Sequence, residues 1–171
     1  MTVTGVNDNV SDDNVTSTIT VAINQGSTND AKYDALSSQS VSVTTTDGVD
    51  AATFTIAETD NATLVSESGG TDTFSVVLGS EPTGNVVFSL TAGDGTEVSL
   101  SALVLTFSTS NWNTAQTVTV TGVNDNVSDD NVTSTITVAI NQSNTVDTKY
   151  DALSSQSVTV TTTDDDTAAF T

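Results

Sequence analysis

One long repeat constrains this chain more than any other feature. The stretch TVTGVNDNVSDDNVTSTITVAINQ begins at Thr2 and returns unchanged at Thr119, a spacing of 117 residues (119 − 2 = 117). The stretch YDALSSQSV recurs at the same spacing, from Tyr33 and from Tyr150. The block from about Ala52 to Val118 occurs once. Near-identity over such a length indicates tandem duplication, which is typical of stacked modules rather than of catalytic domains.

The repeat divides the chain into two parts. Residues 1–51 match the C-terminal half of a preceding β-sandwich repeat, and residues 52–171 make one complete repeat. A repeat of this length is too long for a solenoid unit and suits one β-sandwich domain. Met1 is interpreted as an added start residue, because the basic region and apolar run of a signal peptide do not follow it.

Apolar residues alternate with Thr or Ser along most of the complete repeat. Residues with branched side chains at Cβ favour strands, and period-two alternation is typical of antiparallel strands that pack on one face. The sequence therefore predicts an all-β protein, an antiparallel Ig-like β-sandwich of about seven strands. The residues expected to face its core are Phe74, Val76 and Leu78; Val86, Phe88 and Leu90; Leu103, Leu105 and Phe107; Val118 and Val120; Ile136, Val138 and Ile140; Val158 and Val160.

The chain is strongly acidic, with 22 Asp and Glu residues against two Lys and a formal net charge of −20. Such a surface repels nucleic acid and anionic membranes, so neither is expected as a partner. Membrane insertion is not expected either, because no stretch approaches the roughly 18 apolar residues that span a bilayer. Two explanations of the acidic residues are open: they serve solubility alone, or some of them cluster and need cations.

The position of the acids distinguishes these two explanations. They avoid the strands and collect in loops, chiefly in residues 124–131 and 164–166. Neighbouring carboxylates repel by roughly 1 kcal/mol per pair at 4 Å in water, so converging loops need neutralisation. Oxygen ligands select hard cations, and calcium accepts irregular geometry better than magnesium does. The chain has no His and no Cys for a zinc, copper or iron–sulfur site.

Several short motifs occur in a characteristic order along the complete repeat. They are Phe54-Thr55-Ile56, Val65-Ser66-Glu67, Gly84-Asn85-Val86-Val87, Gly95-Thr96-Glu97, Leu105-Thr106-Phe107 and the run Gln116 to Val123 before an acidic loop. In this order the repeat resembles the Calx-beta domain, which occurs in sodium–calcium exchangers and in tandem arrays of bacterial surface proteins. The resemblance implies a seven-strand sandwich that binds calcium at one end through converging loops.

The resemblance also implies a set of calcium ligands: Glu67, Glu97, Asp125, Asp129, Asp164, Asp165 and Asp166. Two positions depart from the family, since Val132 replaces an acid and Glu97 replaces a more usual Asp. The half-repeat matches with Asp8, Asp12, Asp47 and Asp50, but Gly48-Val49 interrupts its terminal triplet. The alternative for any single loop Asp is an Asx turn or a solvated charge.

These features predict a calcium-binding structural or adhesive repeat, a spacer in a large secreted or bacterial cell-surface protein. Its partners would be neighbouring repeats of the same protein, and it would not be an enzyme. A Ser-His-Asp triad is impossible without histidine. Paired carboxylates can cleave glycosides, but these lie on loops of a repeated module with no sign of a cleft.

Two alternative functions stay open. A glycan- or protein-recognition module would use loops near Trp112, although this ring is expected to plug the bottom of the sandwich. A self-assembling fibre subunit would use residues 1–51, which hold only the last three strands of a sandwich and leave edges open. The sequence leaves three outcomes open for those residues: they are disordered, they pair within the chain, or they exchange head-to-tail with another molecule.

Overall fold

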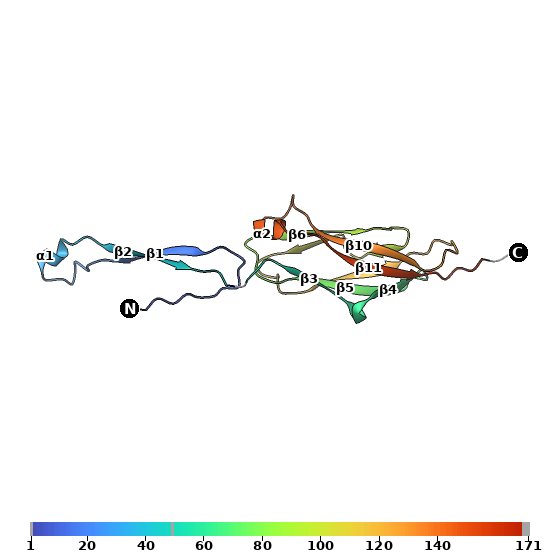
Figure 1. Ribbon diagram of the computed structural model, residues 1–171, viewed down its shortest axis with the longest axis horizontal. Coiled ribbons are helices and arrows are strands. Elements are labelled where there is room, and N and C mark those ends of the chain that lie inside the picture. Colours follow the sequence, from blue (N-terminus) through green and yellow to red (C-terminus); the bar gives the residue numbers. More distant parts are fainter. Residues whose placement is uncertain (1, 49, 169–171) are drawn as a thin grey trace. The chain divides into compact units, whose positions relative to one another are not determined.

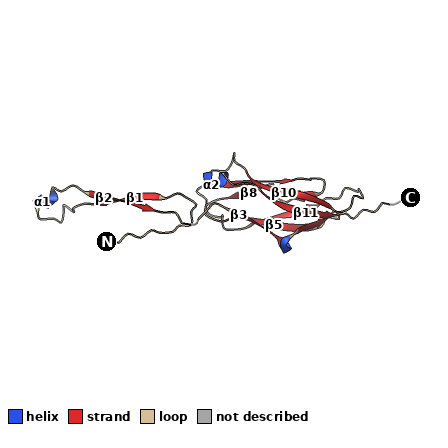
Figure 2. Cartoon of the chain, viewed as in Figure 1, coloured by secondary structure: helices blue, strands red, loops and turns tan. Residues whose placement is uncertain are grey.

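The computed structural model describes residues 2–48 and 50–168. The chain forms two compact units. Among the described residues, the first unit holds 2–8 and 12–48, and the second holds 9–11 and 50–168. Asn9–Ser11 belongs to the second unit, where the Ser11 N–H donates to the Glu81 carbonyl at 3.0 Å. Strands are the main regular structure of both units (Figure 2). None of the helices in the described residues is long and apolar enough to cross a membrane.

The first unit is a β-hairpin. Its antiparallel strands β1 (Val15–Val21) and β2 (Gln39–Thr45) pair over seven residues each, from Val15 opposite Thr45 to Val21 opposite Gln39 (Figure 1). The connection contains the short helix α1 (Ala31–Asp34). Asp30 caps this helix, because its side chain accepts a hydrogen bond from the Lys32 N–H at 2.9 Å.

The second unit is an antiparallel β-sandwich, as the alternating pattern predicted. One sheet has the strand order β4-β11-β10-β6-β8 and the other β3-β5-β9-β7, and within them only β4 and β11 run parallel. The described residues hold nine strands here rather than about seven, since β4, β7 and β8 are short. The strands are β3 (Phe54–Glu58), β4 (Thr63–Ser66), β5 (Thr71–Leu78), β6 (Val86–Ala92), β7 (Val98–Leu100), β8 (Val104–Phe107), β9 (Gln116–Gly122), β10 (Val132–Ile140) and β11 (Gln156–Thr163). The short helices are η1 (Thr59–Asn61) and α2 (Thr148–Asp151).

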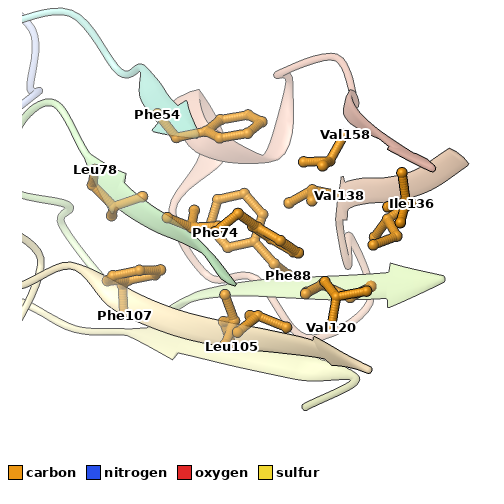
Figure 3. Close-up of a cluster of buried hydrophobic side chains, with 14 of the residues drawn as sticks. Phe54, Phe74, Leu78, Phe88, Leu105, Phe107, Val120, Ile136, Val138 and Val158 are labelled. Carbon is orange, nitrogen blue, oxygen red and sulfur yellow. The ribbon is translucent and has the colours of Figure 1, made fainter. Parts of the chain in front are cut away.

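The core lies between the two sheets and consists of the alternating apolar side chains (Figure 3). The Phe54 and Phe88 rings meet edge to face with centroids 4.9 Å apart, and Phe88 meets Phe107 at 5.9 Å. Trp112 is half-buried against this core. The prediction for Leu103 was wrong: its side chain is 62% exposed, because it lies in a bend that interrupts the alternation before β8.

The hairpin β10–β11 has the register of β1–β2, from Val132 opposite Thr162 to Val138 opposite Gln156. It lies inside the five-stranded sheet, where β10 pairs with β6 and β11 pairs with β4. The parallel pairing of β11 with β4 sets Thr163 opposite Ser66. This register brings the residues that follow both strands to the same end of the sandwich, where most of the predicted ligands lie.

Candidate metal centre

Four chain segments meet at this end of the sandwich. Glu67 follows β4, and its N–H donates to the Thr163 carbonyl at 3.1 Å, which ties it to the end of β11. Glu97 precedes β7, and its carbonyl accepts from the Val123 N–H at 2.8 Å, just after β9. The β9–β10 loop adds Asp125 and Asp129, and the residues after β11 add Asp164 and Asp166.

The structure brings six of the seven predicted ligands close together. Three groups each offer carboxylate oxygens that lie within 4.8 Å of one another: Glu67 with Asp125 and Asp166, Glu67 with Asp129 and Asp164, and Glu97 with Asp125 and Asp129. Oxygens bound to one calcium ion at 2.3–2.6 Å lie at most about 5 Å apart, so each group has suitable spacing. The groups share members, so ions bound by them would be neighbours.

Glu67 is the most unusual residue of the centre. Its side chain is 2% exposed, and both carboxylate oxygens are buried without a hydrogen-bond partner. Glu97 is 3% exposed and has one such oxygen, Oε2. Burying an ionised carboxylate without a partner is very costly, so such groups in proteins are protonated, paired or bound to metal.

The carboxylates of the centre repel one another. Burial first, and then the charges of Asp125 and Asp164, raise the pKa of Glu67 to about 7. Burial, followed by the charges of Asp129 and Asp125, also raises the pKa of Glu97. Because both pKa values are raised, binding of protons or of a cation would stabilise the centre.

Backbone and side-chain hydrogen bonds shape the acidic loops. The Asp125 carboxylate accepts from the Val127 N–H at 2.8 Å, an Asx turn of the kind that the sequence left open. Asp164 accepts from the Asp130 N–H at 3.2 Å and from the Asp166 N–H at 2.8 Å, which links the β9–β10 loop to the end of β11. These bonds use only part of the oxygen ligand capacity of the two carboxylates.

Asp165 behaves differently from its neighbours. It belongs to none of the three groups, and its carboxylate accepts from the Asn124 side-chain amide at 3.4 Å. The sequence alone did not separate Asp165 from Asp164 and Asp166, because the three stand in one run. The run follows the end of β11 and contains the hydrogen bond from the Asp166 N–H to the Asp164 carboxylate, so no regular alternation along the sequence separates the three residues.

The acids of the half-repeat lie in a different setting. Asp8, Asp12 and Asp47 correspond to Asp125, Asp129 and Asp164 at the repeat spacing of 117 residues. Asp50 aligns with Asp166, one residue short of that spacing. The three groups found in the described residues all lie between positions 67 and 166. The half-repeat carries no counterpart of Glu67 and Glu97, since these belong to the block that occurs once.

A buried carboxylate that the sequence did not single out is Asp147. It is 1% exposed, caps α2 by accepting from the Lys149 and Tyr150 N–H groups, and also accepts from the Thr83 N–H and hydroxyl. Burial raises its pKa, but these hydrogen bonds outweigh burial and the pKa is lowered. The contrast with Glu67 is informative, because Asp147 has the partners that Glu67 lacks.

The chain is similar to solved β-structures at low identity. The apo-form Calx CBD1 domain is 15% identical, with 66% of this chain and 98% of that chain covered and a TM-score of 0.44. Domains 4 and 5 of the S-layer protein SbsC are 18% identical, with 88% and 58% covered and a TM-score of 0.47. The E. coli chaperone DraB is 8% identical, with 70% and 59% covered and a TM-score of 0.47. No family model and no curated protein matches the sequence.

Proposed function

We propose that the second unit is a calcium-binding structural repeat, a spacer or adhesive module of a large extracellular protein. The observation that carries the proposal is Glu67, whose two carboxylate oxygens are buried without partners among five other carboxylates. An oxygen-only ligand set without His or Cys fits a hard cation, and the irregular spacing favours calcium over magnesium. The ordered motifs that resemble the Calx-beta domain support the same ion.

The function would be mechanical rather than catalytic. The ion would bind carboxylates from the β9–β10 loop and from residues after β11, together with Glu67 and Glu97, so it would fix the end of the sandwich where the chain leaves β11. A ligand that binds only the folded state adds about 2.7 kcal/mol of stability at a hundredfold excess over its dissociation constant. Millimolar calcium outside cells suits such modules, which supports a secreted or bacterial cell-surface location.

Thermal unfolding of the full chain in excess calcium, in excess magnesium and in chelator, at matched ionic strength, tests this proposal. Matched ionic strength separates ion binding from screening of the −20 net charge. Calcium is expected to raise the Tm by well above the magnesium effect. Equal Tm values in all three solutions would mean that the acids serve solubility alone.

Three variants assign the effect to the centre. Glu67→Gln and Asp129→Asn are expected to remove most of the calcium-dependent rise in Tm, while Asp165→Asn keeps it, since Asp165 lies outside the three groups. Glu67→Gln is also expected to raise the Tm in chelator, because it removes a buried charge among like charges. A variant that merely damaged the fold would lower the Tm in both solutions.

A further inference from the structure

The hairpin β1–β2 has an apolar face that the rest of its unit leaves open. Val21 is 59% exposed and Val41 58%, whereas Val138 and Val158 at the same repeat positions are 0% and 1% exposed. An open groove runs along this face in the first unit, and its lining includes Val15, Ile19 and Val43 together with Ser17 and Thr45. Residues 3–8 of the same unit also line this groove, and Ile19 and Val43 are half-buried, so the cover is partial and Val15, Val21 and Val41 stay exposed. A two-stranded sheet with exposed apolar side chains is only marginally stable by itself.

The second unit shows what covers this same sequence. The edge of β10 pairs with β6, from Ile136 opposite Ala92 to Ile140 opposite Phe88. The edge of β11 pairs with β4, from Val160 opposite Thr63 to Thr163 opposite Ser66. The apolar face packs on the side chains of Phe54, Phe74 and Phe88 (Figure 3). Both edges of β1–β2 lack such strands in the described residues.

We propose that the β1–β2 hairpin of one molecule binds residues 54–122 of a second molecule, in the place of the second molecule's own β10–β11. Ile19, Val21, Val41 and Val43 would then take the positions of Ile136, Val138, Val158 and Val160. The displaced β10–β11 hairpin presents nearly the same sequence, with Thr159 at the position of Ser42, and can bind a third molecule in the same way. The contact is head-to-tail, so repetition gives open chains of molecules.

The exchange does not need new chemistry. Each molecule exchanges one set of contacts for another with the same hairpin register and with strand side chains that differ only at Ser42 and Thr159, so the contact energy is nearly conserved. Each molecule has two hairpins but one acceptor for them, residues 54–122, so every β1–β2 hairpin that is covered uncovers one β10–β11 hairpin. The covered area is therefore conserved, and association depends on protein concentration through mass action. The barrier is the opening of the five-stranded sheet between β6 and β4.

The connection to β3 sets the distance that the hairpin would have to span if it bound within its own chain. The Gln156 side-chain amide donates to the Phe54 carbonyl at 3.0 Å, so β11 begins beside the start of β3. If β2 bound its own chain in this way, its end at Thr45 would lie roughly 20 Å from Phe54. Residues 46–53, which reach at most about 29 Å when fully extended, could span this distance only when they are largely extended. A second molecule imposes no such limit.

Cysteine cross-linking tests the pairing directly, since the chain contains no cysteine of its own. Thr137 lies opposite Thr91 across β10 and β6, and Thr20 is the repeat counterpart of Thr137. Opposite residues in antiparallel strands lie about 4.5–5.5 Å apart between Cα atoms, within the range of a disulfide. Thr20→Cys and Thr91→Cys chains, with different masses, are unfolded, mixed, refolded together in chelator and oxidised.

A disulfide between Thr20→Cys and Thr91→Cys chains is expected, with a yield that increases with protein concentration. The matched control replaces Thr20→Cys by Ser42→Cys, whose counterpart Thr159 pairs with Thr135 in β10 and not with β6. We expect about tenfold less linked product from this control. Equal yields from the two mixtures, or no linked product, would overturn the proposal. Because the chains are refolded in chelator, the outcome does not depend on the metal centre and is distinguishable from its failure.

Charged substitutions distinguish a second molecule from the hairpin's own chain. Val138→Asp with Val158→Asp keeps β10–β11 out of the core and leaves β1–β2 as the only matching hairpin. This chain is expected to fold, with the Trp112 emission of the unsubstituted folded chain, and to have at least the mass of a dimer by light scattering. Val21→Asp with Val41→Asp is the folded, monomeric control, and all four substitutions together should unfold the chain. A folded monomer or an unfolded chain from the first pair would each overturn the proposal.

Discussion

The Tyr150 hydroxyl donates a hydrogen bond to the Ser80 carbonyl at 2.7 Å and accepts one from the Ser80 N–H at 3.1 Å, in a fully buried setting. It thereby fastens the segment between β10 and β11 to the turn after β5. Tyr33 has the same neighbours in sequence and the same place in the repeat, yet it is 58% exposed. The two residues form a matched pair in one chain.

Tyr150→Phe is expected to destabilise the second unit by about 1–3 kcal/mol, because the Ser80 N–H and carbonyl lose a buried partner. Tyr33→Phe should change the free energy of unfolding by less than about 0.5 kcal/mol, as is usual for exposed positions. Denaturant unfolding of dilute protein, followed by Trp112 fluorescence, measures both. Equal losses of unfolding free energy for the two variants would contradict the finding that Tyr150 is buried while Tyr33 is exposed.

Gly122 and Gly5 make a second matched pair at the repeat spacing. A Cβ at Gly122 would overlap the Ser66 backbone, including its carbonyl, whereas at Gly5 its nearest neighbour would be the Thr45 side-chain methyl at 3.2 Å. Gly122→Ala is therefore expected to cost about 1–3 kcal/mol through overpacking, and Gly5→Ala much less. Because Gly122 joins β9 to the acidic loop, Gly122→Ala should also weaken calcium binding in a titration followed by calorimetry. Unchanged calcium affinity would contradict this link between β9 and the centre.

The calcium-free protein should lose stability as the pH rises from about 4.5 to 7. The folded-state pKa of Glu67 is raised to about 7 from an ordinary value of 4.5, so in this range the folded state binds more protons than the unfolded state. This contribution to stability is present below pH 4.5 and is lost as the pH rises through 7. The raised pKa values of Glu97 and Asp166 act in the same direction.

Urea unfolding in chelator across pH 5–8 measures this slope. Glu67→Gln should flatten it, while Asp165→Asn should leave the part due to Glu67, since burial and then the Asp165 charge raise the pKa of Asp166, but Asp165 is not among the charges that raise the pKa of Glu67. Calcium should reverse the trend, because the ion binds the deprotonated carboxylates and competes with protons. A calcium-free chain that grows more stable over this range would show that the carboxylates of the centre are not packed against one another as described.

Calcium should slow hairpin exchange, if both proposals hold. Glu67 and Glu97 precede β10, whereas Asp129 and Asp164 accompany β10–β11, so a bound ion would bridge the part of the sandwich that stays and the part that leaves. At a hundredfold excess over the dissociation constant, an ion that must leave first reduces the opening rate about a hundredfold.

The rate of cross-linking between folded Thr20→Cys and Thr91→Cys chains, in calcium and in chelator, measures this effect. Adding Asp129→Asn to both chains should remove the difference, and adding Asp165→Asn should keep it. Equal cross-linking rates in calcium and in chelator would show that ion binding at the metal centre does not restrain the β10–β11 hairpin.

The amino-acid sequence by itself determined the local structure of this protein. The alternation of apolar and hydroxyl residues predicted the core strands, because period two places every second side chain on one face. The nearly identical hairpins β1–β2 and β10–β11 adopt the same register, since pairing within a hairpin depends on residues near one another in the chain. The acidic loops could also be recognised, because they interrupt the strands.

Only the tertiary structure decided what these elements do. Tyr33 and Tyr150 share their sequence but differ in burial, because burial is provided by residues 54–122, which lie far away in the chain and occur once. Glu67 belongs to the centre because the parallel pairing of β4 with β11 brings it to the end of β11, and Asp165 lies outside the three groups although its neighbours lie within them. Burial and ligand geometry arise from contacts between distant segments, and no local pattern of residues specifies those contacts.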